Sequence, residues 1–168
     1  MKKVSVLGIG FLTAIAFATV MMFNACNDDA CKDVTCLNGG TCIDGTCNCA
    51  TGYEGTDCAT ESRVKFIGTW TASDDCNTSG TGSYIVTVSN GTAINEVKIT
   101  NFWDVFANPV VATVNDNIIT IANQEPDNDD FFVTGQGSIS GSTITWSYTI
   151  DGSQAGSSVD VCSSTWTK

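Results

Sequence analysis

The placement of the cysteines constrains this chain most. Six of its nine cysteines lie between positions 31 and 58, in the spacing C-x4-C-x5-C-x4-C-x-C-x8-C. So short a segment cannot bury enough apolar surface to fold alone, so covalent cross-links must restrict its unfolded state. Dense cysteine usage also indicates an oxidising compartment. The spacing predicts a disulfide-stapled unit over residues 31–58 of an exported protein.

The residues between these cysteines sharpen the prediction. Asn38-Gly39-Gly40-Thr41 and Gly52-Tyr53-Glu54-Gly55 supply the turn chemistry of tight hairpins. The whole segment, CLNGGTC to CNCATGYEGTDC, resembles an EGF-like module. The resemblance implies the pairs Cys31–Cys42, Cys36–Cys47 and Cys49–Cys58. Zinc binding would instead require all six thiols to stay reduced outside the cell.

Some EGF-like modules bind calcium through acidic residues near the first and third cysteines. Asp29 and Asp44 are the weak candidates for such ligands here, but Ala30 stands where those members carry a Glu or Gln. Calcium takes six or more oxygen ligands. We therefore expect a structural module without a cofactor or metal, with calcium binding as the alternative.

The N-terminal segment has the features of a targeting signal. Lys2 and Lys3 precede an uncharged run from Val4 to Phe23, which is long enough for a transmembrane anchor. The run begins at the extreme N-terminus and ends at Ala25-Cys26, which favours a secretion signal. Phe23 to Cys26 resembles a lipobox, although Phe23 and Asn24 replace the usual Leu and small residue. The resemblance implies a signal peptide over residues 1–25 and acyl chains such as palmitate on Cys26, which anchor the protein to the membrane.

Residues 26–30 form an acidic tether. Asn27-Asp28-Asp29 resembles the signal that sends Bacteroidota lipoproteins to the outer face of the outer membrane, and a merely solvated spacer is the alternative. An EGF-like module followed by a Ser- and Thr-rich β-region also resembles a recurrent architecture of these lipoproteins. We therefore expect a lipid-anchored protein of the outer membrane, exposed at the cell surface.

Charge and composition exclude several functions. Five basic residues remain after Cys26 against 18 acidic ones, a formal net charge of −13, which repels nucleic acid. The sequence has no histidine. Its absence removes the commonest general base and every Ser-His or Cys-His nucleophile. We expect no nucleic-acid partner and no enzymatic activity.

Beyond a short linker, residues 59–63, the chain from 64 to 168 is rich in β-branched residues and turn signals, with no helical period. About eight antiparallel strands are expected, which predicts an all-β meander that forms a barrel or a sandwich. The expected ranges are Lys65 to Ser73, Ser83 to Ser89, Ile94 to Thr100, Val110 to Val114, Ile118 to Asn123, Phe131 to Ser140, Thr143 to Ile150 and Ser158 to Thr167.

Two features favour the barrel. Cys76 and Cys162 are the cysteines left over, and pairing them places the first and last strands side by side. Gly68-Thr69-Trp70 resembles the G-x-W element of lipocalin-like barrels, although a plain core Trp is an alternative. Large residues are available to fill the interior: Trp70, Tyr84, Phe132, Trp146, Tyr148 and Trp166.

Two segments are candidates for binding. Phe102, Trp103 and Phe106 form an aromatic connection that either rims the barrel mouth as a binding surface or caps the core. The acidic run Glu125 to Asp130 either binds a divalent cation or, as we favour, forms a solvated hairpin loop. The favoured function is a surface module that recognises a protein or glycan. The alternatives are a lipocalin-like carrier of a small apolar ligand and, more remotely, a hydrolase with paired carboxylates.

Acylation of Cys26 is directly testable. Metabolic labelling with a fatty-acid analogue should mark the wild-type protein and leave Cys26→Ala unmarked, because that thiol is the acceptor. Equal labelling of the two proteins would end the lipoprotein interpretation.

Overall fold

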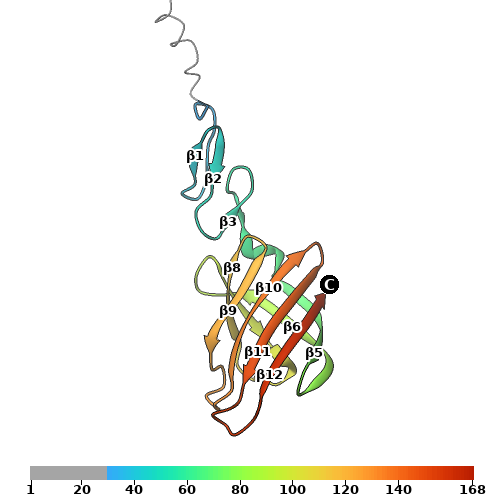
Figure 1. The fold of residues 1–168 in the computed structure, drawn as a ribbon. Helices are drawn as coiled ribbons and strands as arrows, with labels where there is room; N and C mark the ends of the chain where they lie inside the picture. Colours follow the sequence, from blue (N-terminus) through green and yellow to red (C-terminus); the bar gives the residue numbers. More distant parts are fainter. Residues whose placement is uncertain (1–29) are drawn as a thin grey trace, which may run out of the picture.

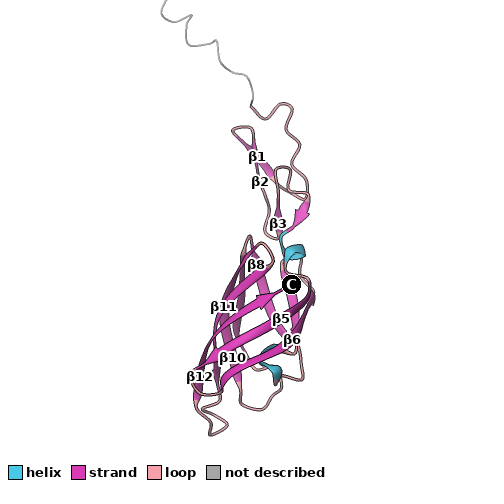
Figure 2. Ribbon diagram, turned by 90° about the vertical axis from the view of Figure 1, so that its right-hand side faces the viewer, coloured by secondary structure: helices cyan, strands magenta, loops and turns pink. Residues whose placement is uncertain are grey.

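The computed structural model describes residues 30–168, which form a small cysteine-rich unit and a closed β-barrel (Figure 1). The expected signal peptide, Cys26 and Asp29 lie outside the described residues. The cysteine-rich unit sits at one end of the barrel, and the C-terminus lies at that same end. We call this the proximal end and the opposite one the distal mouth (Figure 2).

The cysteine-rich unit consists of short hairpins held by disulfides. Strands β1 (Thr41–Ile43) and β2 (Thr46–Asn48) pair across a turn at Asp44-Gly45, where both residues have positive φ. Its disulfides join Cys31 to Cys42, Cys36 to Cys47 and Cys49 to Cys58, the pairs expected from the sequence resemblance.

The connection to the barrel is ordered rather than a free linker. Within the expected linker, β4 (Thr60–Glu61) pairs with β3 (Tyr53–Glu54), and the 3-10 helix η2 (Ser62–Lys65) follows at once. The buried Arg63 donates to the carbonyl oxygens of Ala93 and Glu96 at 2.9 and 3.3 Å. These bonds fasten the connection to the loop after the second barrel strand, so the two units are held firmly together.

Eight antiparallel strands close the barrel, so the sandwich alternative is excluded. Their boundaries agree with the expected ranges to within one residue, with three exceptions. The first strand begins and ends three residues later, the second begins three residues earlier, and the third begins two residues later. The neighbours in order are β10-β11-β12-β5-β6-β7-β8-β9. The strands are β5 (Gly68–Cys76), β6 (Gly80–Asn90), β7 (Glu96–Thr100), β8 (Val110–Asn115), β9 (Ile118–Gln124), β10 (Phe132–Ser140), β11 (Thr143–Asp151) and β12 (Val159–Thr167).

The first and last strands close the barrel, as the leftover cysteines predict. β5 pairs with β12 from Thr71↔Thr167 to Cys162↔Cys76, and a disulfide joins the last pair. Closure leaves no free strand edge in the barrel, which removes a template for aggregation.

Alternating side chains fill the interior. Trp70, Trp166 and Tyr148 are almost completely buried, and the Trp70 indole donates to the Phe66 carbonyl oxygen at 2.8 Å. The expectation that Phe132 points inward is wrong. Val133 and Ile139 face the core from β10, so residues of the opposite parity, Phe132 among them, face outward.

Two glycines on β10 allow close packing against β11, Gly137 against the ring of Trp146 and Gly135 against the Cβ and backbone of Tyr148. Gly135 lies opposite Tyr148 and Gly137 opposite Trp146. A Cβ atom at position 137 would approach the Trp146 ring to 2.7 Å, and one at 135 would approach the Tyr148 Cβ to 2.5 Å. Glycine is therefore required at both positions by the side chains beside it.

Gly137→Ala should consequently lower the free energy of unfolding by about 1–3 kcal/mol, the usual cost of overpacking a core. Gly82→Ala is the matched control, because a Cβ there meets nothing within 4 Å. The control should change stability by no more than about 0.5 kcal/mol. Equal denaturation midpoints for the two variants would contradict the packing argument.

Candidate functional site at the distal mouth

The distal mouth is built from four connections: residues 77–79, 101–109, 125–131 and 152–158. The connection 101–109 carries the aromatic cluster and contains the 3-10 helix η3 (Phe102–Asp104). Asn101, Trp103 and Asp104 all have positive φ, a conformation that is uncommon outside glycine. This tight backbone path turns consecutive side chains in different directions.

Phe102 points into the barrel and is part of the core. Its side chain is fully buried, and its ring centroid lies 4.9 Å from Tyr148 and 5.9 Å from both Trp146 and Trp166. Edge-to-face contacts of this kind are favourable beyond the area they bury. Phe102 therefore plugs the centre of the barrel from its distal end.

The three aromatic residues of this connection do not form one binding rim. Phe106 is also buried, with 3% of its surface exposed, so the rim interpretation is wrong for Phe102 and Phe106. Trp103 is only half-buried, and it packs against Phe106 and Phe131 with ring centroids 5.9 and 6.4 Å apart. Of the expected rim, Trp103 alone stays open to a partner.

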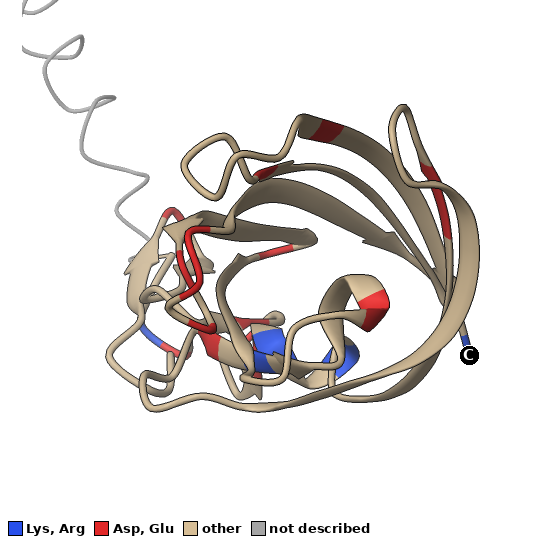
Figure 3. Cartoon of the chain, turned by 90° about the horizontal axis from the view of Figure 1, so that it is seen from below, with Lys and Arg blue, Asp and Glu red and all other residues tan. Residues whose placement is uncertain are grey.

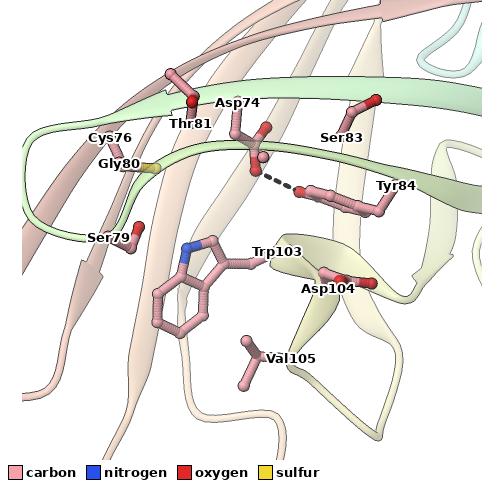
Figure 4. Close-up of a pocket in the computed structure, with 11 residues that line it drawn as sticks. Asp74, Cys76, Ser79, Gly80, Thr81, Ser83, Tyr84, Trp103, Asp104 and Val105 are labelled. Atoms are coloured by element: carbon pink, nitrogen blue, oxygen red, sulfur yellow. Dashed lines mark hydrogen bonds between the residues drawn. The ribbon is translucent and has the colours of Figure 1, made fainter.

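Trp103 lies between two hollows of the mouth. The larger has a volume of about 230 Å³ and is lined by Asp74, Tyr84, Trp103, Asp104, Val105 and the start of β6 (Figure 4). The smaller, of about 120 Å³, lies between Trp103, Phe131, Ile150 and Ser157. Ser79, in the turn between β5 and β6, borders both hollows.

A carboxylate and two phenols meet at the wall of the larger hollow. Asp74 Oδ2 accepts hydrogen bonds from the hydroxyls of Tyr84 at 2.5 Å and Tyr148 at 2.7 Å. Burial, followed by the Asp74 hydrogen bond, raises the pKa of Tyr84 far above its usual range. Burial also raises the pKa of Tyr148, with Tyr84 and Asp74 adding to the effect. Both phenols therefore remain protonated and act as donors.

The second oxygen of Asp74 is different. Only 7% of the Asp74 surface is exposed, and its Oδ1 is buried with no hydrogen-bond partner among the described residues. A buried carboxylate oxygen without a donor is costly, and such atoms are rare in folded proteins. Neither sequence motif nor spacing singled out Asp74, since the pair Asp74-Asp75 reads as an ordinary polar strand end.

Other carboxylates fasten the loops of the mouth. Asp160 accepts the backbone N–H groups of Thr78 and Ser79 at 2.9 and 3.1 Å. Burial acts to raise the pKa of Asp160, but hydrogen bonding by the Ser79 side chain and by the backbone N–H groups of Thr78 and Ser79 outweighs it and holds the pKa below its usual range. Asp127 accepts the N–H groups of Ala107 and Asn108, each at 2.8 Å, and these bonds lower its pKa.

The acidic run Glu125 to Asp130 is a loop whose carboxylates accept hydrogen bonds from nearby backbone N–H groups. Besides Asp127, Glu125 accepts the Asp130 N–H at 2.7 Å and Asp129 accepts the Phe131 N–H at 3.2 Å. These acids satisfy backbone donors, which agrees with the hairpin-loop interpretation.

One group of possible metal-ligand atoms among the described residues lies near the mouth. Within residues 30–168, Cys76, Asp160 and Cys162 bring three ligand-type atoms within 4.8 Å, but the two sulfurs are bonded to each other. Asp44, the described calcium candidate, is exposed at the tip of the β1–β2 turn.

Comparison with known proteins finds matches among solved structures alone. No protein-family model and no curated protein matches the sequence. A redesigned beta barrel has a TM-score of 0.45 at 10% identity, covering 64% of this chain and 94% of its own. The protein EF1p2_mFAP2b, solved bound to DFHBI, has a TM-score of 0.44 at 16% identity, covering 64% and 98%. No helix within residues 30–168 has the length and apolarity to cross a membrane.

Two neighbouring substitutions separate scaffold from surface at the mouth. Phe102→Ala should lower the free energy of unfolding by about 3–5 kcal/mol, because it empties the centre of the core. Trp103→Ala should cost no more than about 2 kcal/mol, since its ring is only partly removed from water. Chemical denaturation of both variants measures the difference, and a Trp103→Ala loss as large as that of Phe102→Ala would make Trp103 a core residue.

Proposed function

We propose that this protein is an exported, lipid-anchored binding protein of the cell surface that recognises its partner at the distal mouth. The observation that carries the proposal is the half-buried Trp103 beside an open hollow, on loops held in place by Asp127 and Asp160. Aromatic residues set in rigid, partly enclosed sites are typical anchors of recognition. The role is one of binding rather than of catalysis.

The order of the parts supports this role. In the proposal, Cys26 is acylated, the EGF-like module follows the tether, and the barrel stands beyond the module with its mouth facing away. Lys65 Nζ contacts Glu54 of the cysteine-rich unit at 2.6 Å and Asn117 of the barrel at 2.8 Å. A module fixed to the barrel in this way serves as a spacer that presents the mouth to the surroundings.

The packed interior favours recognition at the mouth over carriage of a ligand. A barrel of eight strands has room inside either for its own side chains or for one small ligand. Here Phe102 and the rings around it occupy the centre. The lipocalin-like alternative would require Phe102 to leave the core.

Cross-linking on intact cells, followed by recovery of the protein, tests the proposal. Trp103→Ala should reduce recovery of the partner at least about tenfold, a typical hot-spot loss, while the barrel stays folded. Ile43→Ala is the control, because Ile43 is 55% exposed on the cysteine-rich unit at the other end of the molecule. Loss of the partner from Ile43→Ala and its retention by Trp103→Ala would move recognition to the cysteine-rich unit and overturn the proposal.

A further inference from the structure

Charge is distributed very unevenly along the barrel. The five basic residues of the described chain are Lys32, Arg63, Lys65, Lys98 and Lys168. None lies in the four connections of the distal mouth or in the strand ends that enter them. Nine acids lie there: Asp74, Asp75, Asp104, Glu125, Asp127, Asp129, Asp130, Asp151 and Asp160. Figure 3 looks along the barrel from this end and shows the acidic residues around its rim.

Within this acidic end, Asp74 is the acid that has a buried oxygen, Oδ1, without a hydrogen-bond partner among the described residues. Asp127 and Asp160 spend both oxygens on backbone N–H groups, whereas Asp74 uses one oxygen for two tyrosines and leaves Oδ1 unpaired. No ion pair in the described chain involves a distal acid, since the two present join Arg63 to Glu61 and Lys65 to Glu54. Among the described residues, Asp74 therefore has no ion-pair partner, and one of its oxygens accepts no hydrogen bond.

The hollow beside Asp74 offers the other contacts that a cation needs. The Trp103 indole and the exposed Asp104 line the same space as Asp74 and Tyr84 (Figure 4). A guanidinium or ammonium group is attracted to the face of an indole, and to a carboxylate it gives hydrogen bonds stronger than those between neutral groups. Calcium is a poorer match, because it needs six or more oxygens around it.

We propose that the larger hollow of the distal mouth is a binding site for an arginine or lysine side chain, presented by a basic segment of a protein partner. The inference rests on the proposed function and names the chemistry of the partner. A volume of about 230 Å³ is below the roughly 300–1,000 Å³ of sites for drug-sized ligands, so it suits one side chain. The exposed Asp104 lines the hollow, and the exposed Asp129 and Asp130 lie in another connection of the same mouth, so further basic residues of the segment would meet negative charge there.

The site is tested by NMR titration of the full chain in detergent, with the Trp103 indole N–H as the reporter. N-acetyl-arginine amide should shift this signal saturably, and N-acetyl-lysine amide should do so as well. N-acetyl-citrulline amide, which has the shape of the arginine probe without its charge, should leave the signal unchanged. Equal shifts from the arginine and citrulline probes would overturn the proposal.

Two matched variants test whether binding of the arginine probe depends on Asp74 itself. Asp74→Asn should weaken arginine binding at least about tenfold, the loss expected for a hydrogen bond to a charged group. Asp75→Asn removes the same charge from the next residue, which is exposed on the outer face, and should change binding less than about twofold. Equal losses from the two would reduce the effect to general surface charge and refute a specific site.

A second variant covers the case in which Asp74→Asn fails to fold. Gly82 lies opposite Asp74 on the neighbouring strand and borders the hollow, and a Cβ there meets nothing within 4 Å, so Gly82→Lys leaves the core intact and places a cation at the site. This variant should abolish binding of the arginine probe. Undiminished binding would contradict the inference.

The outcomes also separate this inference from the proposed function. If methyl glycosides shift the Trp103 signal and the arginine probe does not, the partner is a glycan and the inference fails while recognition at the mouth stands. If Trp103→Ala retains the cell-surface partner, the proposed function itself fails.

Discussion

The structure of the distal mouth depends on the pairing of the first barrel strand with the last. β5 and β12 are brought together by residues 86 positions apart, and such a loop is costly in entropy to close. The disulfide between Cys76 and Cys162 reduces that cost by restricting the unfolded chain. Asp74 lies two residues before one cysteine and Asp160 two residues before the other, so closure places both carboxylates at the mouth.

The aromatic core is the second determinant. Tyr148 on β11 lies opposite Cys162 on β12. Its ring packs against Phe102, and its hydroxyl donates a hydrogen bond to Asp74. One side chain thus connects the plug of the barrel with the carboxylate at its wall. The connection 101–109 is held from inside by Phe102 and from outside by Asp127, which leaves Trp103 fixed in position but partly open to solvent.

Most of the architecture could be predicted because its signals are local. Alternation and turn residues located the eight strands, and cysteine spacing indicated the disulfide-rich unit. The prediction that Phe132 faces the core is wrong, although the sequence holds the signal: Val133 and Ile139 are the apolar residues at alternate positions of that strand, and Phe132 is out of phase with them. The inward direction of the Phe102 side chain could not be predicted. It follows from the positive φ angles of Asn101 and Trp103, and neither residue type by itself indicates a positive φ. No local sequence signal marks Asp74, because its contacts with Tyr84 and Tyr148 form only when β5, β6 and β11 come together at one end of the barrel.

The close fit of glycine against ring across β10 and β11 has a consequence for sequence divergence. Positions 137 and 146 share one volume, because a Cβ at 137 would overlap the ring of Trp146. A descendant that acquires a side chain at 137 is expected to have first lost the indole at 146. Paired substitutions at these two positions would therefore mark true relatives of this barrel even where overall identity has faded, and the order of the changes in a lineage is set by the packing.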